Sequence, residues 1–165
     1  MASILKTDKI EGVTASGTVQ MPAGHVIQMQ STTTTSSITV TATSLTAGGH
    51  IVSITPKFAN SKILITITGG EQTYSGTGVI TGVTHLYRQL TGGSYADLSG
   101  QLCEQSMGGN DSSDYGHSHS SEFIDTTHNT TNAINYQPYI KTNSGTYYYN
   151  YTPTVITLRV MEIAQ

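Results

Sequence analysis

Two histidines separated by one residue, His117 and His119, are the clearest candidate metal ligands in the sequence. In an extended segment, residues two positions apart point to the same side, so the two imidazoles could bind one ion together. One chain then offers two nitrogen ligands, which is too few for a structural metal site. Three chains around a threefold axis would offer six, enough for an octahedral transition-metal site. The sequence therefore predicts a metal only at the axis of a trimer; the alternative is a pair of solvated histidines in a polar loop.

The residue types of nucleophilic catalysis also occur here, since Ser, His and Asp all lie between Asp114 and His119. A segment this polar brings them together by chance, and no serine elbow framed by glycines follows a strand. Asp111 and Asp114 resemble the start of a calcium loop, but its glycine and distal glutamate are missing. The ten carboxylates are spread too thinly to nominate an acid and a base. We therefore expect no enzymatic activity and no cofactor, and we expect the single cysteine, Cys103, to be a small buried side chain.

Tyrosine is the more informative residue type, because six of the ten tyrosines lie within sixteen positions. These are Tyr136, Tyr139, Tyr147, Tyr148, Tyr149 and Tyr151. Successive side chains of a strand point to opposite faces, so some rings should fill the core and others should lie on the surface. The tyrosines predicted to contact a receptor surface or a neighbouring subunit are Tyr115, Tyr147, Tyr149 and Tyr151. Core packing is the alternative, and a carbohydrate-binding surface is a further hypothesis.

The elements that position these residues are predicted to be β-strands. The 28 Thr, 18 Ser and 17 Gly, together with Val, Ile and Tyr, favour an all-β fold with many turns, and residues typical of helical bundles are scarce. Eight to ten short strands are expected, and the clearest are residues 62–68 and 155–163. Their predicted inward side chains are Ile63, Ile65, Ile67, Ile156, Leu158 and Val160. Residues 106–121 contain hardly an apolar side chain and are predicted to form a long surface loop. This pattern is typical of a sandwich, a jelly roll or a small barrel.

The first 24 residues differ from the rest and are predicted to be an extended attachment arm; a frayed terminus without a role is the alternative. The candidate arm residues are Ile4, Leu5, Lys6, Asp8 and Ile10. The start of the chain lacks the apolar core of a signal peptide, so we expect synthesis in a cytoplasm, and export only as part of a larger assembly. No apolar run approaches the length of a membrane span, so membrane insertion is not expected. A formal net charge of −3, without a basic patch, argues against nucleic acid as a partner.

Six phrases that follow one another along nearly the whole chain resemble a known family. They are residues Ile4–Ile10, Met21–Gln28, Ile54–Lys57 followed by Ser61–Ile65, Leu86–Arg88, Phe123–Asp125 and Val160–Ala164. Together they resemble a family of small virion structural proteins of tailed bacteriophages that are described as tail-fibre-like. The resemblance implies a jelly-roll sandwich similar to trimeric C1q/TNF-like domains, a short N-terminal attachment segment and no enzymatic activity.

We therefore expect an antiparallel jelly-roll β-sandwich over residues 25–165, anchored by an arm over residues 1–24. The expected function is that of a non-enzymatic phage virion protein, a homotrimeric short tail fibre or knob that displays loops toward the host. A capsid decoration or head-fibre protein is the close alternative, and a carbohydrate-binding module is the alternative of another class. The expected partners are further copies of the chain, other virion proteins bound through the arm and, as a further candidate, a host-surface glycan. The expected location is the virion.

Overall fold

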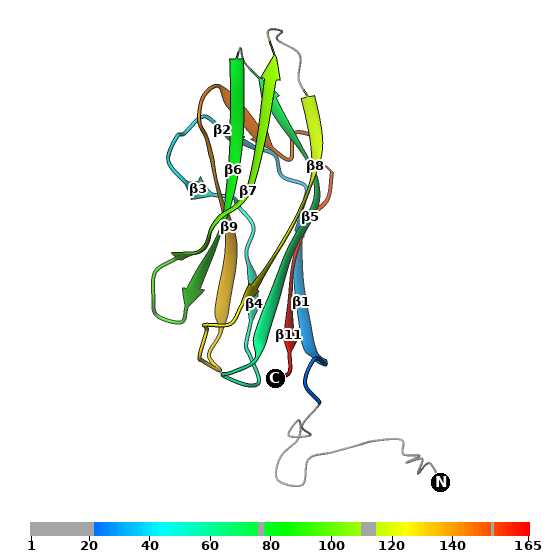
Figure 1. The fold of residues 1–165 in the computed structure, drawn as a ribbon, viewed down its shortest axis with the longest axis vertical. Helices are drawn as coiled ribbons and strands as arrows, with labels where there is room; N and C mark the ends of the chain where they lie inside the picture. The colour runs from blue at the N-terminus through cyan, green and yellow to red at the C-terminus, as the bar shows by residue number, and fades with distance from the viewer. Residues whose placement is uncertain (1–21, 76–77, 110–114, 153) are drawn as a thin grey trace, which may run out of the picture.

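A computed structural model describes residues 22–75, 78–109, 115–152 and 154–165, and in these ranges the chain forms eleven strands and no helix (Figure 1). The strands are β1 (Val26–Thr34), β2 (Ile38–Val40), β3 (Thr46–Ala47), β4 (Val52–Ile54), β5 (Lys62–Ser75), β6 (Gly78–Leu90), β7 (Ala96–Gly109), β8 (Tyr115–Asp125), β9 (Ile134–Thr142), β10 (Thr146–Tyr149) and β11 (Ile156–Ile163). Nothing in these ranges is a helix long and apolar enough to cross a membrane. The predicted arm residues Ile4, Leu5, Lys6, Asp8 and Ile10 lie outside the described residues.

The strands form two antiparallel sheets. In the first sheet the order is β1-β11-β5-β8, and β10 and β2 continue it along the far half of β5. In the second sheet the order is β4-β9-β6-β7, and β3 also pairs with β9. The short strands β2, β3 and β10 can be left aside, and the other eight renumbered 1 to 8 in chain order (β1, β4, β5, β6, β7, β8, β9 and β11). The sheet orders are then 1-8-3-6 and 2-7-4-5, which is the strand order of two interlocked Greek keys. The predicted jelly-roll β-sandwich is thus confirmed.

The core lies between the sheets and follows the alternation that the sequence predicts. Ile63, Ile65 and Ile67 of β5 are at most 1% exposed. The predicted inward residues of β11 are also buried, and Ile134 and Ile140 of β9 face them from the second sheet. Each such side chain contributes about 1.5–3 kcal/mol by leaving water, so these strands supply most of the driving force for the sandwich.

Two consecutive glycines in the middle of β5 allow this strand to pair with one partner in its first half and with another in its second half. Gly69 and Gly70 have φ values of +87° and +74°, and the pairing of β5 with β8 shifts register between Gly69 and Glu71. A Cβ atom at Gly69 would lie 2.3 Å from the carbonyl oxygen of Val155. The irregularity lets β5 pair with β11 before the glycines and with β10 after them.

The predicted long loop over residues 106–121 is wrong. β7 continues to Gly109, and β8 begins at Tyr115 and pairs with β5 from Tyr74 to Ile63. The strands in this region are rich in Ser and Gly, because a backbone ladder between strands needs no apolar side chain. The polar composition therefore hid two strand ends, and residues 110–114 between them lie outside the described residues.

Candidate functional site

Glu162, near the end of β11, is a fully buried carboxylate that fastens the segment between β4 and β5. It accepts hydrogen bonds from the backbone amides of Lys57 and Phe58, at 2.9 and 3.0 Å. The Oγ of Ser61 (2.8 Å) and the Nε2 of Gln28 (2.6 Å) donate to it as well. Burial raises the pKa of this carboxyl, but the hydrogen bonds outweigh burial and hold the pKa below its ordinary value.

Asp125, at the end of β8, joins the two sheets. Its carboxylate is fully buried, and Nη1 of Arg88 in β6 donates to both of its oxygens, at 2.9 Å to Oδ1 and 2.8 Å to Oδ2. The hydroxyl of Tyr136 in β9 donates to the same carboxylate at 2.8 Å, and the backbone amide of Thr127 donates at 2.8 Å. Burial again raises the pKa, and the hydrogen bonds from Arg88, Thr127 and Tyr136 lower it below its ordinary value.

These two networks explain phrases that carry the family resemblance. The residues common to the phrases and the networks are Gln28, Lys57, Ser61, Arg88, Asp125 and Glu162. Each buried carboxylate already accepts several hydrogen bonds, so neither is placed as an accessible acid or base. Residues of these phrases therefore make contacts that join strands.

The structure separates the two histidines that were predicted to bind a metal together. His119 is 1% exposed and points between the sheets, with its Nε2 2.8 Å from Oγ of Ser121, whereas His117 is exposed. In this single chain His119 lies inside the sandwich and does not reach a surface where copies could meet, and the metal site on a threefold axis stays a prediction. Among the described residues, no three His, Cys, Asp or Glu side chains are grouped so as to hold a metal ion.

His119 instead belongs to a buried group around Tyr149. The ring of His50 stacks on Tyr149 with centroids 5.8 Å apart, and the ring of His119 meets it edge-on at 6.3 Å. Burial lowers the pKa of both histidines, and together with the nearby His50 it brings the pKa of His119 to about 4. The atoms His50 Nε2, His119 Nδ1 and Tyr149 Oη have no hydrogen-bond partner. The group is therefore neutral at pH 7 and sealed from solvent.

The predicted contact tyrosines divide between core and surface. Tyr147 and Tyr149 are 0% and 1% exposed, so the prediction that they face a host or a neighbouring subunit is wrong. They point inward because β10 lies in the first sheet with alternate side chains toward the core. Tyr151 is 43% exposed and contacts Tyr148, at a centroid distance of 4.9 Å. Tyr115 begins β8, and only its backbone is described. Cys103, predicted to be buried, is half-buried, and burial raises the pKa of its thiol.

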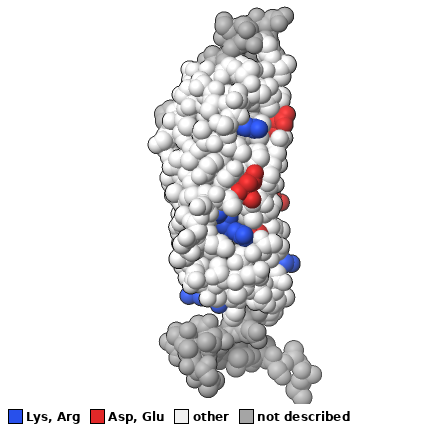
Figure 2. Space-filling view, turned by 90° about the vertical axis from the view of Figure 1, so that its left-hand side faces the viewer, with Lys and Arg blue, Asp and Glu red and all other residues white. Residues whose placement is uncertain are grey.

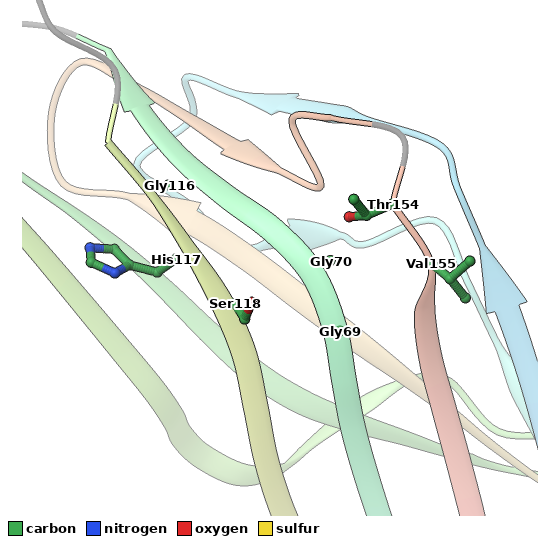
Figure 3. Close-up of a pocket in the computed structure, with 7 residues that line it drawn as sticks. All are labelled: Gly69, Gly70, Gly116, His117, Ser118, Thr154 and Val155. Carbon is green, nitrogen blue, oxygen red and sulfur yellow. The ribbon is translucent and has the colours of Figure 1, made fainter.

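A shallow pocket of about 450 Å³ lies where β10 and β11 separate along β5 (Figure 3). Its lining residues are Gly69, Gly70, Gly116, His117, Ser118, Thr154 and Val155. In Figure 3 the ring of His117 extends away from the two glycines. The lining offers one imidazole, two hydroxyls and no carboxylate, so it does not assemble an acid and base pair.

The outer face of the first sheet carries a continuous line of apolar side chains, which we call the apolar row (Met29, Met161, Leu64 and Ile124). Strand pairing places these residues directly beside one another on β1, β11, β5 and β8. Met29 is 54% exposed and Ile124 is 51% exposed, while the two between them are half-buried. Val26 and Ile163 lie next to the row toward the chain ends. A contiguous apolar surface of this kind marks an interaction site more often than chance.

The rows that follow on the same face are polar. The first contains Ser31, Arg159, Thr66 and Glu122, and the second contains Thr33, Thr157, Thr68 and Ser120. Threonine occupies outward positions in both, as its β-propensity and polarity predict. The apolar row is therefore bordered on one side by two opposite charges and then by hydroxyls.

The outer face of the second sheet is different, because it carries three tyrosines grouped around Tyr139. Tyr87 and Tyr139 stack with centroids 3.9 Å apart, and Tyr95 lies 6.1 Å from Tyr139. Beside them, Nδ1 of His85 lies 2.6 Å from Oδ2 of Asp97. Figure 2, which views the molecule from the side of β3, β6 and β9, shows few charged side chains, with positive and negative ones interspersed. This face has no continuous basic patch.

No protein-family model matches the chain, and no curated protein matches it. Two solved structures, of the Gx and Gt strains of infectious bursal disease virus, align with the whole chain at 12% and 13% identity. Their TM-scores are 0.38 and 0.33, and the chain spans 41% and 43% of their lengths. The assignment of the jelly roll therefore rests on the strand order of this chain.

Sequence reasoning missed the apolar row and the two carboxylate networks. The sequence does place Met161 on the outward side of β11, where an apolar residue is unexpected. This residue alone could have indicated an apolar surface on the outer face. The row itself depends on register between four strands that are far apart in sequence. The networks depend on contacts such as that of Arg88 with Asp125, 37 residues away, which no local pattern encodes.

Proposed function

We propose that this protein is a non-enzymatic structural protein of a bacteriophage virion that acts as a homotrimer, either a short tail fibre or a knob. The jelly-roll fold and the family resemblance support a structural role. The observation that carries the proposal is the apolar row, because a protein that worked as a monomer would leave it in contact with water. The virion location follows from the resemblance of the six phrases.

The polarity of the sandwich supports a fibre-like arrangement. β1 starts and β11 ends at one end of the molecule, whereas β5 and β7 end, and β6 and β8 begin, at the other (Figure 1). An attachment segment before Pro22 would therefore leave the ends of β5 and β7 and the starts of β6 and β8 at the far end, directed away from the anchor toward the host.

Oligomer mass and particle location test the proposal. Light scattering of the purified chain is expected to give the mass of three chains. Antibody labelling of intact virions is expected to find the protein at the tail. A stable monomer at all concentrations would contradict the structural role. A trimer found regularly over the capsid would instead support the close alternative, a capsid decoration or head-fibre protein.

A carbohydrate-binding role is the second candidate, and the tyrosines on the second sheet favour it. The Tyr87, Tyr95 and Tyr139 rings give apolar area with polar tips, and the His85–Asp97 pair offers hydrogen bonds next to them. A glycan array would identify a ligand, and the Tyr139→Ala variant is expected to lose it while Tyr151→Ala keeps it. An array without binders would remove this candidate.

A further inference from the structure

We infer that the apolar row binds a second copy of this chain, in a register that brings Glu122 of one copy against Arg159 of the next. This inference rests on the proposed homotrimer and specifies which surface and which residues form its contact. It is carried by the strand register, the exposure of the apolar side chains and the charges beside them.

The apolar row crosses the whole sheet from one edge strand to the other. Neighbouring strands lie about 4.8 Å apart, so four strands give a row about 15 Å wide. Its two ends, Met29 on β1 and Ile124 on β8, are more exposed than its centre. Each copy can therefore offer one end of the row to one neighbour and the other end to a second neighbour. A head-to-tail contact of this kind is what a closed ring of three requires.

The charges next to the row have opposite signs on opposite sides of β5. Arg159 lies on β11 and Glu122 on β8, in one register row with Thr66 between them. Two strand intervals separate them by about 10 Å, too far for a direct ion pair. Both are exposed, and neither has an ion-pair partner within the described part of the chain.

Opposite charges in this arrangement make the face complementary to itself. When the β8 side of one copy approaches the β11 side of the next, Glu122 meets Arg159 and the apolar ends meet beside them. If the β8 sides of two copies met, two Glu122 side chains would lie together, and if the β11 sides met, two Arg159 side chains would. Repulsion between like charges disfavours both arrangements. The apolar contact supplies the affinity, and the charge pair fixes the register.

Charge reversal tests the contact directly. Arg159→Glu and Glu122→Arg, each alone, are expected to weaken association about tenfold or more, because each places like charges together. The double variant is expected to return the dissociation constant to within about threefold of wild type, because it restores an opposite pair. Sedimentation equilibrium at low salt measures all four proteins, and the loss in the single variants is expected to shrink at high salt.

Glu104→Arg and Lys141→Glu serve as matched controls, since these residues lie on the second sheet. They are expected to leave association unchanged. Met161→Asp, in the middle of the row, is expected to abolish association while circular dichroism reports an unchanged sandwich.

Cross-linking provides a second measurement that does not depend on weakened association. In a Cys103→Ser background, chains carrying Arg159→Cys are mixed with chains carrying Glu122→Cys and oxidised. A mixed disulfide dimer is expected, and a mixture of Glu104→Cys with Arg159→Cys chains is the control that should give none.

The outcomes separate this inference from the proposed function. A wild-type trimer that persists in Met161→Asp, or single charge variants that the double variant does not rescue, would overturn the inferred contact and leave the trimer intact. A wild-type chain that stays monomeric would overturn both. A wild-type dimer with charge rescue would support the contact and contradict the trimer.

Discussion

Four buried ionisable residues of the sandwich fall into two kinds. Asp125 and Glu162 are charged and surrounded by donors, which hold the pKa of each carboxyl low despite burial. His50 and His119 are buried with one ring nitrogen each left unpaired, and burial lowers the pKa of both. The first kind prefers the charged form and the second the neutral form. The fold is therefore most stable where the carboxylates are ionised and the imidazoles are neutral.

Stability is expected to fall as the pH decreases from about 6.5 toward 4. Over this range an unfolded histidine binds a proton, whereas His119, with its pKa lowered to about 4, does not. Because the unfolded state binds more protons, the free energy of unfolding falls by about 1.4 kcal/mol per pH unit for this residue. His50 acts in the same direction. Urea denaturation at several pH values above about 4.5 measures how steeply the free energy of unfolding changes with pH. In this range Asp125 and Glu162 are still ionised, so their contribution to stability is retained.

The neighbouring exposed histidine provides the control. His119→Leu removes the titrating group and is expected to give a flatter pH dependence, whereas His117→Gln should keep the wild-type slope. A slope in His119→Leu equal to that of wild type would show that the buried imidazole is not responsible. The comparison uses slopes, so a constant loss of stability in either variant does not affect it.

For single strands, the alternation of apolar and polar residues predicts which side chains point inward. The sequence does not predict how strands pair with one another. Residues 62–68 and 155–163 were predicted with the correct inward faces, because period-two apolar patterns need no knowledge of partners. The ends of β7 and β8 were missed, because Ser and Gly there pair through the backbone alone. Tyr149 was placed wrongly, since only the position of β10 in the sheet decides which ring faces inward.

Gly70→Ala is expected to destabilise the fold by about 3 kcal/mol, because two costs add. The residue has a φ of +74°, and an added Cβ would lie 2.2 Å from Cγ1 of Ile156, at the start of β11. An L-residue in this region costs about 1–2 kcal/mol, and overpacking adds a similar amount. Gly92→Ala is the control, since its φ is +79° and nothing lies within 4 Å, so only the first cost applies. Equal losses in urea denaturation would contradict the close contact with β11.

For the whole molecule, the inward residues of the first sheet change character from one end to the other. Glu162 and Asp125 flank Ile63 near the chain ends, apolar rows follow, and His119 lies opposite Gly69 further along. The apolar row lies on the outer face near the carboxylate end, where Met161 and Glu162 are consecutive. The surface inferred to join copies is therefore backed by the two buried carboxylates, whereas His50 and His119 lie toward the end where β5 and β7 finish.

This polarity predicts that mild acid loosens the molecule at one end first. Hydrogen exchange at about pH 4.5, corrected for intrinsic rates, is expected to show loss of protection in β10 and in β8 near His119, with protection retained in β11 and the first half of β5. The physical reason is that, among the side chains that the structure describes, the groups near His119 are His50, Tyr149 and, next to Tyr149, Cys103, so none of these is a carboxylate that could pair with a protonated His119. His128, the other buried imidazole in the described ranges, lies at the opposite end beside the Phe58 carbonyl, so His128→Gln should leave the pattern unchanged. Uniform loss of protection, or the same pattern in His119→Leu, would contradict an acid response that starts at the imidazole end.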